Sequence, residues 1–69
     1  MTHLHETLNS LNEQGIVHDF INSSIALYHD ELEKLESIEN IPGYDLFGIQ
    51  ESFGFFGDYM AVYERVGNN

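Results

Sequence analysis

The chain has 69 residues and no cysteine, which limits it to one small domain without disulfides or thiolate metal ligands. Twelve Asp and Glu residues stand against two Lys and Arg residues, so the formal net charge is −10 at pH 7. This balance argues against direct binding to nucleic acid or to anionic membranes, because both need clustered positive charge, and it favours a basic protein partner.

The N-terminal segment is expected to form a first helix. Thr2 can cap it, Gly15 can close it, and Leu4, Leu8 and Leu11 share one stripe. The stripe is narrow, so the helix must dock on the rest of the chain. The segment has neither a basic stretch nor an apolar run, so no signal peptide or membrane span is expected and the predicted location is the cytoplasm.

Residues 19–40 are expected to form one long amphipathic helix. Apolar residues recur there at steps of four and three, the period of one helix face: Ile21, Ile25, Tyr28, Leu32, Leu35 and Ile38. The other face is acidic, with Lys34 as its one base. An alternative start at Ser23 or Ser24 leaves residues 16–21 as a short extended piece. The apolar stripe also allows a short coiled-coil seam, and hence a homodimer.

The C-terminal third begins with a predicted turn. Pro42 sets the first central position of a type II turn, and Gly43 accepts positive φ at the second. Two short helices are expected after it, at residues 46–53 and 59–66, because an aspartate precedes each segment and a glycine follows it.

A β-hairpin is the alternative in this third of the chain. Residues 47–50 can pair with residues 60–66, since aromatic and β-branched side chains are frequent in both. The caps favour helices, so the predicted fold class is all-α. We expect residues 1–69 to form a single small acidic helical bundle built on the long helix.

Spaced carboxylates are the first candidate binding surface. They lie along the expected long helix, most of them at every third residue: Asp30, Glu31, Glu33, Glu36 and Glu39. Such a series can stand in for backbone phosphates, which lie a few ångströms apart along a strand. The competing interpretation is a solvated helix face, which charge runs usually indicate. The scarcity of bases favours the binding interpretation, because ordinary surfaces mix both signs.

An aromatic segment is the second candidate. Glycines stand on either side of Phe55 and Phe56, which lets the rings project as anchors for a partner. The competing interpretation is that so small a chain needs both rings for its own core. Both hold if one ring is buried and its neighbour is exposed.

Catalytic and metal sites are not expected. The four histidines, His3, His5, His18 and His29, lack the spacing at which three or four ligands converge on zinc. No serine lies in a nucleophile elbow, and no glycine-rich loop precedes a phosphate-binding base. We therefore expect a non-enzymatic protein without a cofactor or metal.

In size, lack of cysteine and acidic excess, the chain resembles the small inhibitors of phages and mobile elements. Those proteins block restriction or CRISPR enzymes, and some act as nucleic-acid mimics. The resemblance is compositional and transfers no residues. The expected function is an acidic inhibitor that binds a basic, nucleic-acid-handling surface of a partner protein, as an anti-CRISPR or anti-restriction DNA mimic. The alternative is a small helical adaptor or regulatory protein that docks through apolar and aromatic surfaces, with acidity serving solubility.

Overall fold

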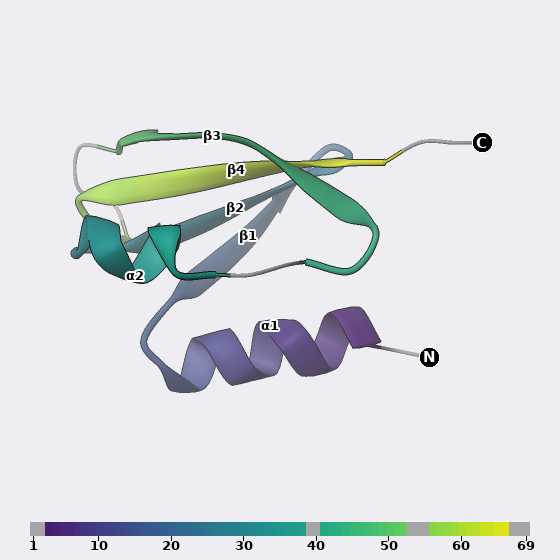
Figure 1. Ribbon diagram of the computed structural model, residues 1–69, viewed down its shortest axis with the longest axis horizontal. Coiled ribbons are helices and arrows are strands. Elements are labelled where there is room, and N and C mark those ends of the chain that lie inside the picture. Colours follow the sequence, from purple (N-terminus) through teal and green to yellow (C-terminus); the bar gives the residue numbers. More distant parts are fainter. Residues whose placement is uncertain (1–2, 39–40, 53–55, 67–69) are drawn as a thin grey trace.

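The protein combines helices with an antiparallel sheet (Figure 1). The computed structural model describes residues 3–38, 41–52 and 56–66. The elements are, in chain order, α1 (His3–Glu13), β1 (Val17–Ile21), β2 (Ser24–His29), α2 (Leu32–Glu36), β3 (Tyr44–Glu51) and β4 (Tyr59–Arg65). The prediction of an all-α helical bundle is therefore wrong.

The four strands form one sheet in the order β1-β2-β4-β3, and every neighbouring pair is antiparallel. The chain runs from β2 through α2 to β3 and leaves a place between these two strands, which β4 then fills (Figure 1). The edges of the sheet are β1 and β3, and the interior strands are β2 and β4.

A tight hairpin replaces the first part of the predicted long helix. Ile21 pairs with Ser24, so the loop between β1 and β2 has only two residues, and Asn22 in this loop has a φ of 57°. Asparagine enters the left-handed region more readily than most residues, as two-residue hairpin loops demand. The helix expected over residues 19–40 is therefore wrong, and the extended alternative for residues 16–21 comes close to β1.

β2 explains why a helix was expected. Ile25, Ala26 and Leu27 each expose 1% or less of their surface, so side chains on both faces of this interior strand are buried. A strand with buried residues on both faces shows no alternation of apolar and polar residues. The steps of four and three from Ile21 to Tyr28 therefore matched a helical period, although Ile25 and Tyr28 point to opposite faces of the sheet.

Within described residues 19–38, α2 is the only helix, and it has five residues. Leu35 is 1% exposed and packs on the sheet, whereas Leu32 remains 36% exposed. Because Ile25 and Leu32 belong to different elements, no helical seam joins them. The coiled-coil seam that this stripe allowed therefore has no continuous helix on which to form.

The turn at Pro42 and Gly43 is present as predicted. Gly43 has a φ of 83°, and the Tyr44 N–H donates a hydrogen bond to the Ile41 carbonyl at 3.0 Å. This positive φ is what the second central position of a type II turn requires. The turn leads directly into β3.

The C-terminal third is the β-hairpin that was the alternative expectation. β3 pairs with β4 along its length, with a bulge between Leu46 and Gly48. The helices predicted at residues 46–53 and 59–66 are therefore wrong. The aromatic and β-branched side chains of this region fit a pleated, half-buried surface better than a helix, and this outweighed the capping signals.

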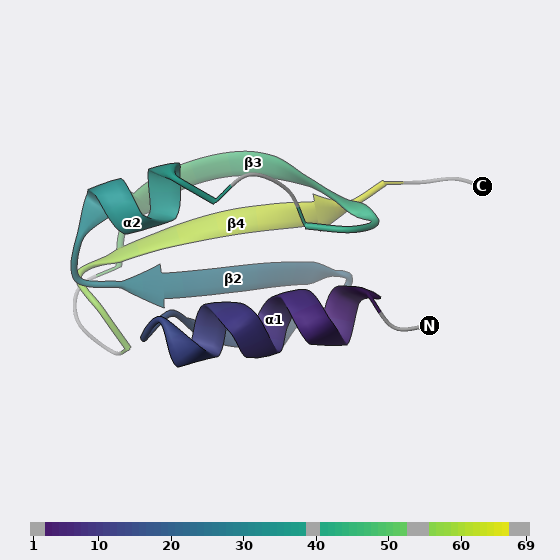
Figure 2. The same cartoon turned by 60° about the horizontal axis from the view of Figure 1, so that its bottom comes forward.

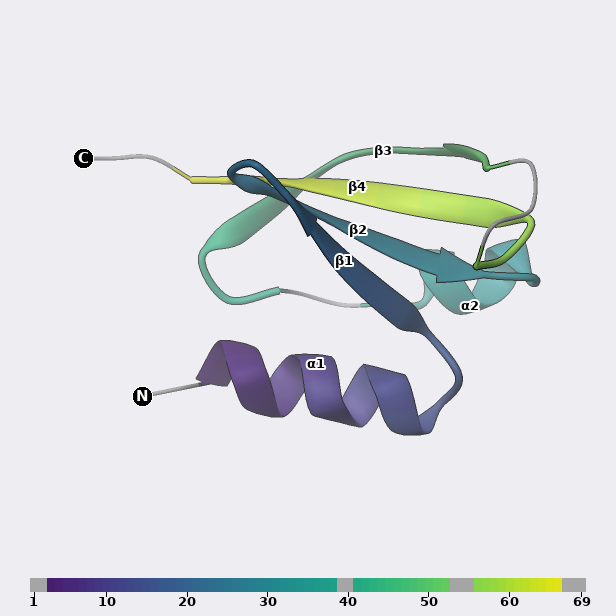
Figure 3. The same ribbon diagram turned by 180° about the vertical axis from the view of Figure 1, so that it is seen from behind.

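Both helices cover the same face of the sheet (Figure 2). The core lies between them and that face: Leu8, Leu11, Ile16, Ile25, Leu27, Leu35, Ile41, Ala61 and Tyr63. α1 is present as predicted, its apolar stripe is buried, and Gly15 follows it with a φ of 87°. Seen from behind, the sheet lies in front of α2, and no described helix or strand covers this second face (Figure 3).

Candidate functional site

The predicted acidic residues lie around α2, at one end of the sheet. Asp30 forms the bend after β2, Glu31 precedes α2, and Glu33 and Glu36 belong to it; all of them are exposed. Glu39, like Phe55, lies outside the described residues. These carboxylates therefore lie on a bend and on a five-residue helix, and they do not line one face of a long helix.

Asp30 also stabilises the fold through a hydrogen bond of its side chain. Its Oδ1 accepts a hydrogen bond from the Asp58 N–H at 3.1 Å, which fastens the end of β2 to the connection between β3 and β4. Next to it, the Glu31 N–H donates to Nδ1 of His29 at 2.9 Å. This bond places the proton of the neutral imidazole on Nε2. We call the exposed acidic residues gathered here the α2 acidic patch: Asp30, Glu31, Glu33, Glu36 and Asp58.

A second surface is the uncovered face of the sheet. Directly paired residues share a face, and faces alternate along each strand, so the register defines the members of this surface. We call it the open sheet face: Val17, Asp19, Ile21, Ser24, Ala26, Tyr28, Asp45, Gly48, Gln50, Met60, Val62 and Glu64. Figure 3 shows the sheet from this side.

An aromatic pair lies at one end of the open sheet face. Phe56 meets Tyr28 edge to face, with ring centroids 5.3 Å apart and an angle of 65° between the planes. Tyr28 is 9% exposed, whereas Phe56 is 53% exposed. Of the two phenylalanines predicted to contact a partner, Phe56 therefore presents its ring at the surface.

Like charges face each other at the other end of this surface. Asp45 on β3 is the direct partner of Glu64 on β4, and both side chains are exposed. Directly opposite residues hold their Cβ atoms about 4.5–5.5 Å apart, and like charges in this arrangement are destabilising. Asp19 adds a third carboxylate in the adjacent row.

Neither base of the chain lies on the open sheet face. Arg65 pairs with Tyr44, which places it on the helix-covered side of the sheet, and Lys34 belongs to α2. Within residues 3–38, 41–52 and 56–66, no carboxylate forms an ion pair with Lys34 or Arg65, and every Asp and Glu is exposed. The carboxylates of the described residues therefore face solvent, and no ion pair with Lys34 or Arg65 neutralises them.

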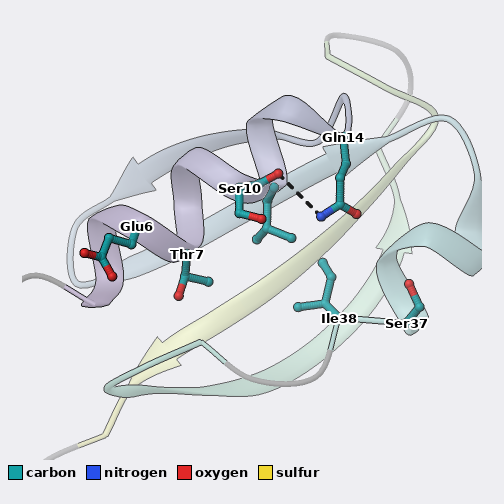
Figure 4. A pocket seen from close by; sticks show the side chains of 7 residues that line it. Glu6, Thr7, Ser10, Gln14, Ser37 and Ile38 are labelled. Atoms are coloured by element: carbon teal, nitrogen blue, oxygen red, sulfur yellow. Dashed lines mark hydrogen bonds between the residues drawn. The ribbon is translucent and has the colours of Figure 1, made fainter.

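A hollow of about 460 Å³ lies on the helical side of the molecule (Figure 4). Side chains of α1, of the residue pair after it and of the segment after α2 line it: Glu6, Thr7, Ser10, Leu11, Gln14, Ser37 and Ile38. The Gln14 side chain donates to the Ser10 carbonyl at 3.4 Å. Among the lining residues that the structure describes, Glu6 is the single ionisable group, and they include no histidine, lysine or second carboxylate to form an acid–base pair with it.

Two further kinds of site were sought in the described residues. They contain no group of three or more His, Cys, Asp and Glu side chains arranged to hold a metal ion. The described helices also include none long and apolar enough to cross a membrane.

The chain matches no protein family model, no curated protein and no solved structure. Its function is therefore argued from the surfaces described above. The sequence predicted Phe56 and the α2 carboxylates as candidate contacts, but it did not place Asp45 opposite Glu64 or put this pair on the same sheet face as Tyr28. These placements follow from the register of β2, β3 and β4, which no pattern within a single segment contains.

Proposed function

We propose that this protein is a non-enzymatic acidic inhibitor that binds a basic, nucleic-acid-handling surface of a partner protein. The observation that carries the proposal is that every acidic side chain in the described part of the chain is exposed and none forms an ion pair with Lys or Arg. Ordinary protein surfaces carry acidic and basic side chains interspersed, and ion pairs between them neutralise part of the charge.

The density of charge supports a nucleic-acid-like surface. The described residues include eleven of the twelve acidic residues and both basic ones, a net charge of −9. The long axis of the molecule measures 34 Å, and 34 Å divided by nine charges is about 3.8 Å per charge. One strand of duplex DNA carries a phosphate about every 3.4 Å. Averaged over all sides of the molecule, the net charge per length is therefore similar to that of one nucleic-acid strand.

The partner class implies a cytoplasmic site of action and a steeply salt-dependent complex. Charge complementarity of this kind mainly accelerates association, and salt screens it. The compositional resemblance to phage and mobile-element inhibitors narrows the proposal to enzymes of restriction or CRISPR systems. Contacts at Phe56 and Tyr28 would supply the desolvated aromatic part of the interface.

The experiment begins with capture of binding proteins from a cell extract at low salt, followed by elution along a salt gradient. The purified captured protein is then tested for nucleic-acid binding at increasing concentrations of the inhibitor. We expect competition with nucleic acid and a steep loss of affinity as salt rises. In a parallel assay, expression of the chain should protect phage from a restriction or CRISPR system. A captured protein that binds nucleic acid unhindered, through a complex indifferent to salt, would contradict the proposal.

A second candidate function is an adaptor that docks through apolar contacts. Several large apolar side chains are exposed and favour it: Phe20, Ile21, Leu32, Leu46, Phe47, Phe56 and Val66. In that case acidity serves solubility alone. Apolar substitutions would then weaken the complex, whereas neutralisation of carboxylates would leave it intact.

A further inference from the structure

We infer that the open sheet face is the docking surface for the basic partner and that the Asp45–Glu64 pair receives one of its Lys or Arg side chains. This inference rests on the proposed function and names the surface that performs it. Its central juxtaposition is a pair of like charges on neighbouring strands beside a half-exposed apolar area.

The two faces of the sheet differ in what covers them. α1 and α2 cover the middle of one face, over the buried core, while Phe20 and Leu46 on the edge strands of that face are each 51% exposed. The open face keeps Met60 and Val62 half-buried and Ile21 44% exposed. A partner that covered it would remove this apolar area from water, which is the general driving force of association.

The Asp45–Glu64 pair is unfavourable for the free protein, because the two carboxylates repel each other across the strands and neither forms an ion pair with Lys34 or Arg65. A cation placed between these carboxylates converts the repulsion into two attractions. Arginine suits this position best, since its planar guanidinium can donate to two carboxylates at once. The two carboxylates therefore favour a single cationic side chain of the partner placed between them. This is a more specific requirement than general attraction to a positively charged surface.

Space is available for the stem of that side chain. Gly48 lies in the row next to the acidic pair, opposite Val62, and no heavy atom approaches the position of an added Cβ within 4 Å. The aliphatic stem of a lysine or arginine can lie over Val62 while its charged end reaches the carboxylates. An aliphatic residue next to it in the partner would contact Met60 and the Tyr28–Phe56 pair.

The occupant we infer is an extended protein segment in which Lys or Arg stands two positions from an apolar residue. Side chains at positions i and i+2 of an extended segment point to the same side, so the cationic and the apolar side chain can both contact the open sheet face, where the acidic pair and the apolar area lie side by side. A second copy of the chain is disfavoured, because it would bring another −10 charge against the three carboxylates of the same face.

The test uses the full chain, labelled with ¹⁵N, and a short synthetic peptide in which arginine and valine occupy every second position in turn, with serine between them. We expect peptide-dependent shifts of amide signals in β2, β3 and β4, at residues near Asp45, Val62 and Glu64. The same peptide with glutamate in place of arginine should give no shifts. Shifts confined to the α2 acidic patch would overturn the inference, and so would a dimer of the chain whose contacts map to the open sheet face.

Three double variants of equal charge change make the test quantitative. Asp45→Asn with Glu64→Gln should weaken peptide binding about fivefold or more, because direct contacts are lost together with long-range attraction. Glu6→Gln with Glu13→Gln on α1 is the matched control and should weaken it less, through long-range attraction alone. Equal weakening by these two pairs would overturn the inference.

The third double variant, Glu33→Gln with Glu36→Gln, reports on the α2 acidic patch. A larger loss for this pair than for the Asp45–Glu64 pair would place docking at α2 and overturn the inference. Thermal melts verify folding, and the Asp45–Glu64 variant should melt no lower than the parent because repulsion is removed. Failure of the chain to compete with nucleic acid for the captured protein would overturn the proposed function while leaving the peptide map unchanged, so the two failures are distinguishable.

Discussion

Gly57 lies so close to the backbone of His29 that a Cβ added to Gly57 would stand 2.8 Å from both the nitrogen and the carbonyl carbon of His29. This contact joins the connection before β4 to the end of β2. The Ser52 hydroxyl donates a hydrogen bond to the Gly57 carbonyl at 2.9 Å, which stabilises the same connection.

The first prediction concerns this contact. Gly57→Ala should lower the free energy of unfolding by about 1–3 kcal/mol, because the neighbouring atoms are backbone and cannot move aside without straining the sheet. Gly48→Ala is the matched control, since a Cβ there meets open space. Urea unfolding of both variants measures the difference. Equal stability of the two variants would show that the contact is looser than described.

A second prediction concerns the docking of α1. Leu8 is 2% exposed and belongs to the core, so Leu8→Ala should cost about 2–5 kcal/mol. A small domain has little more stability than that in total, so loss of cooperative unfolding is an expected form of the result. The control is Leu32→Ala, because Leu32 is 36% exposed and loses far less burial.

A third prediction follows from the pKa of Tyr63. Burial raises the pKa of this hydroxyl above its ordinary value of 10.0. The folded protein therefore holds the phenolic proton more tightly than the unfolded chain does. This contribution to stability is complete below about pH 10 and is lost as the pH rises through the pKa of the folded state. We expect Tyr63→Phe to make the decline of stability at alkaline pH shallower.

The comparison for Tyr63 is Tyr44→Phe, because Tyr44 is only half-buried at the sheet edge. Denaturant unfolding is measured at several pH values from neutral to alkaline for the parent and both variants. Parallel alkaline declines in the parent and Tyr63→Phe would contradict the assignment.

The fourth prediction concerns salt. The net charge of −10 opposes compaction through self-repulsion, so moderate salt should raise the melting temperature. The double variant Asp45→Asn, Glu64→Gln should melt higher than the parent at low salt and respond less to added salt. A melting temperature that stays flat or falls between low and moderate salt would mean that repulsion contributes little.

The fifth prediction separates the two proposed functions. Reversing charge with Glu33→Lys and Glu36→Lys should weaken inhibition through the loss of long-range attraction, and the same reversal at Asp45 and Glu64 should weaken it more. The fold should remain intact, because all four positions are exposed. If the chain is instead an adaptor, Phe56→Ala should weaken its complex and the charge reversal should not. Binding to the captured partner and circular dichroism of each variant are the measurements.

Local signals with one physical meaning were read correctly from the sequence. The apolar stripe of α1 and the turn at Gly43 each allow a single structure, because helical spacing and positive φ have few alternatives. The stretch from Ile21 to Ile38 was ambiguous, since a strand buried on both faces has no period of its own. The Asn22-Ser23 pair was the available signal for a hairpin, and the apolar spacing obscured it.

The candidate site was predicted only where it depends on composition. Exposure of the acidic residues follows from the cost of burying charge, so Asp30, Glu31, Glu33 and Glu36 are at the surface whatever the fold. The facing of Asp45 and Glu64 depends on strand register across a bulge. Register is a property of the whole sheet, so single-segment patterns do not contain it.

The position of β4 between β2 and β3 has a consequence for synthesis on the ribosome. Before residues 59–65 emerge, β2 and β3 lack the neighbour that joins them, and the nascent chain can form only the first hairpin and α1. Completion of the sheet must await contacts between distant parts of the sequence, which slows folding. During that interval the strong negative charge keeps unfinished chains apart, so the acidity that we assign to binding also protects the protein while it is being made.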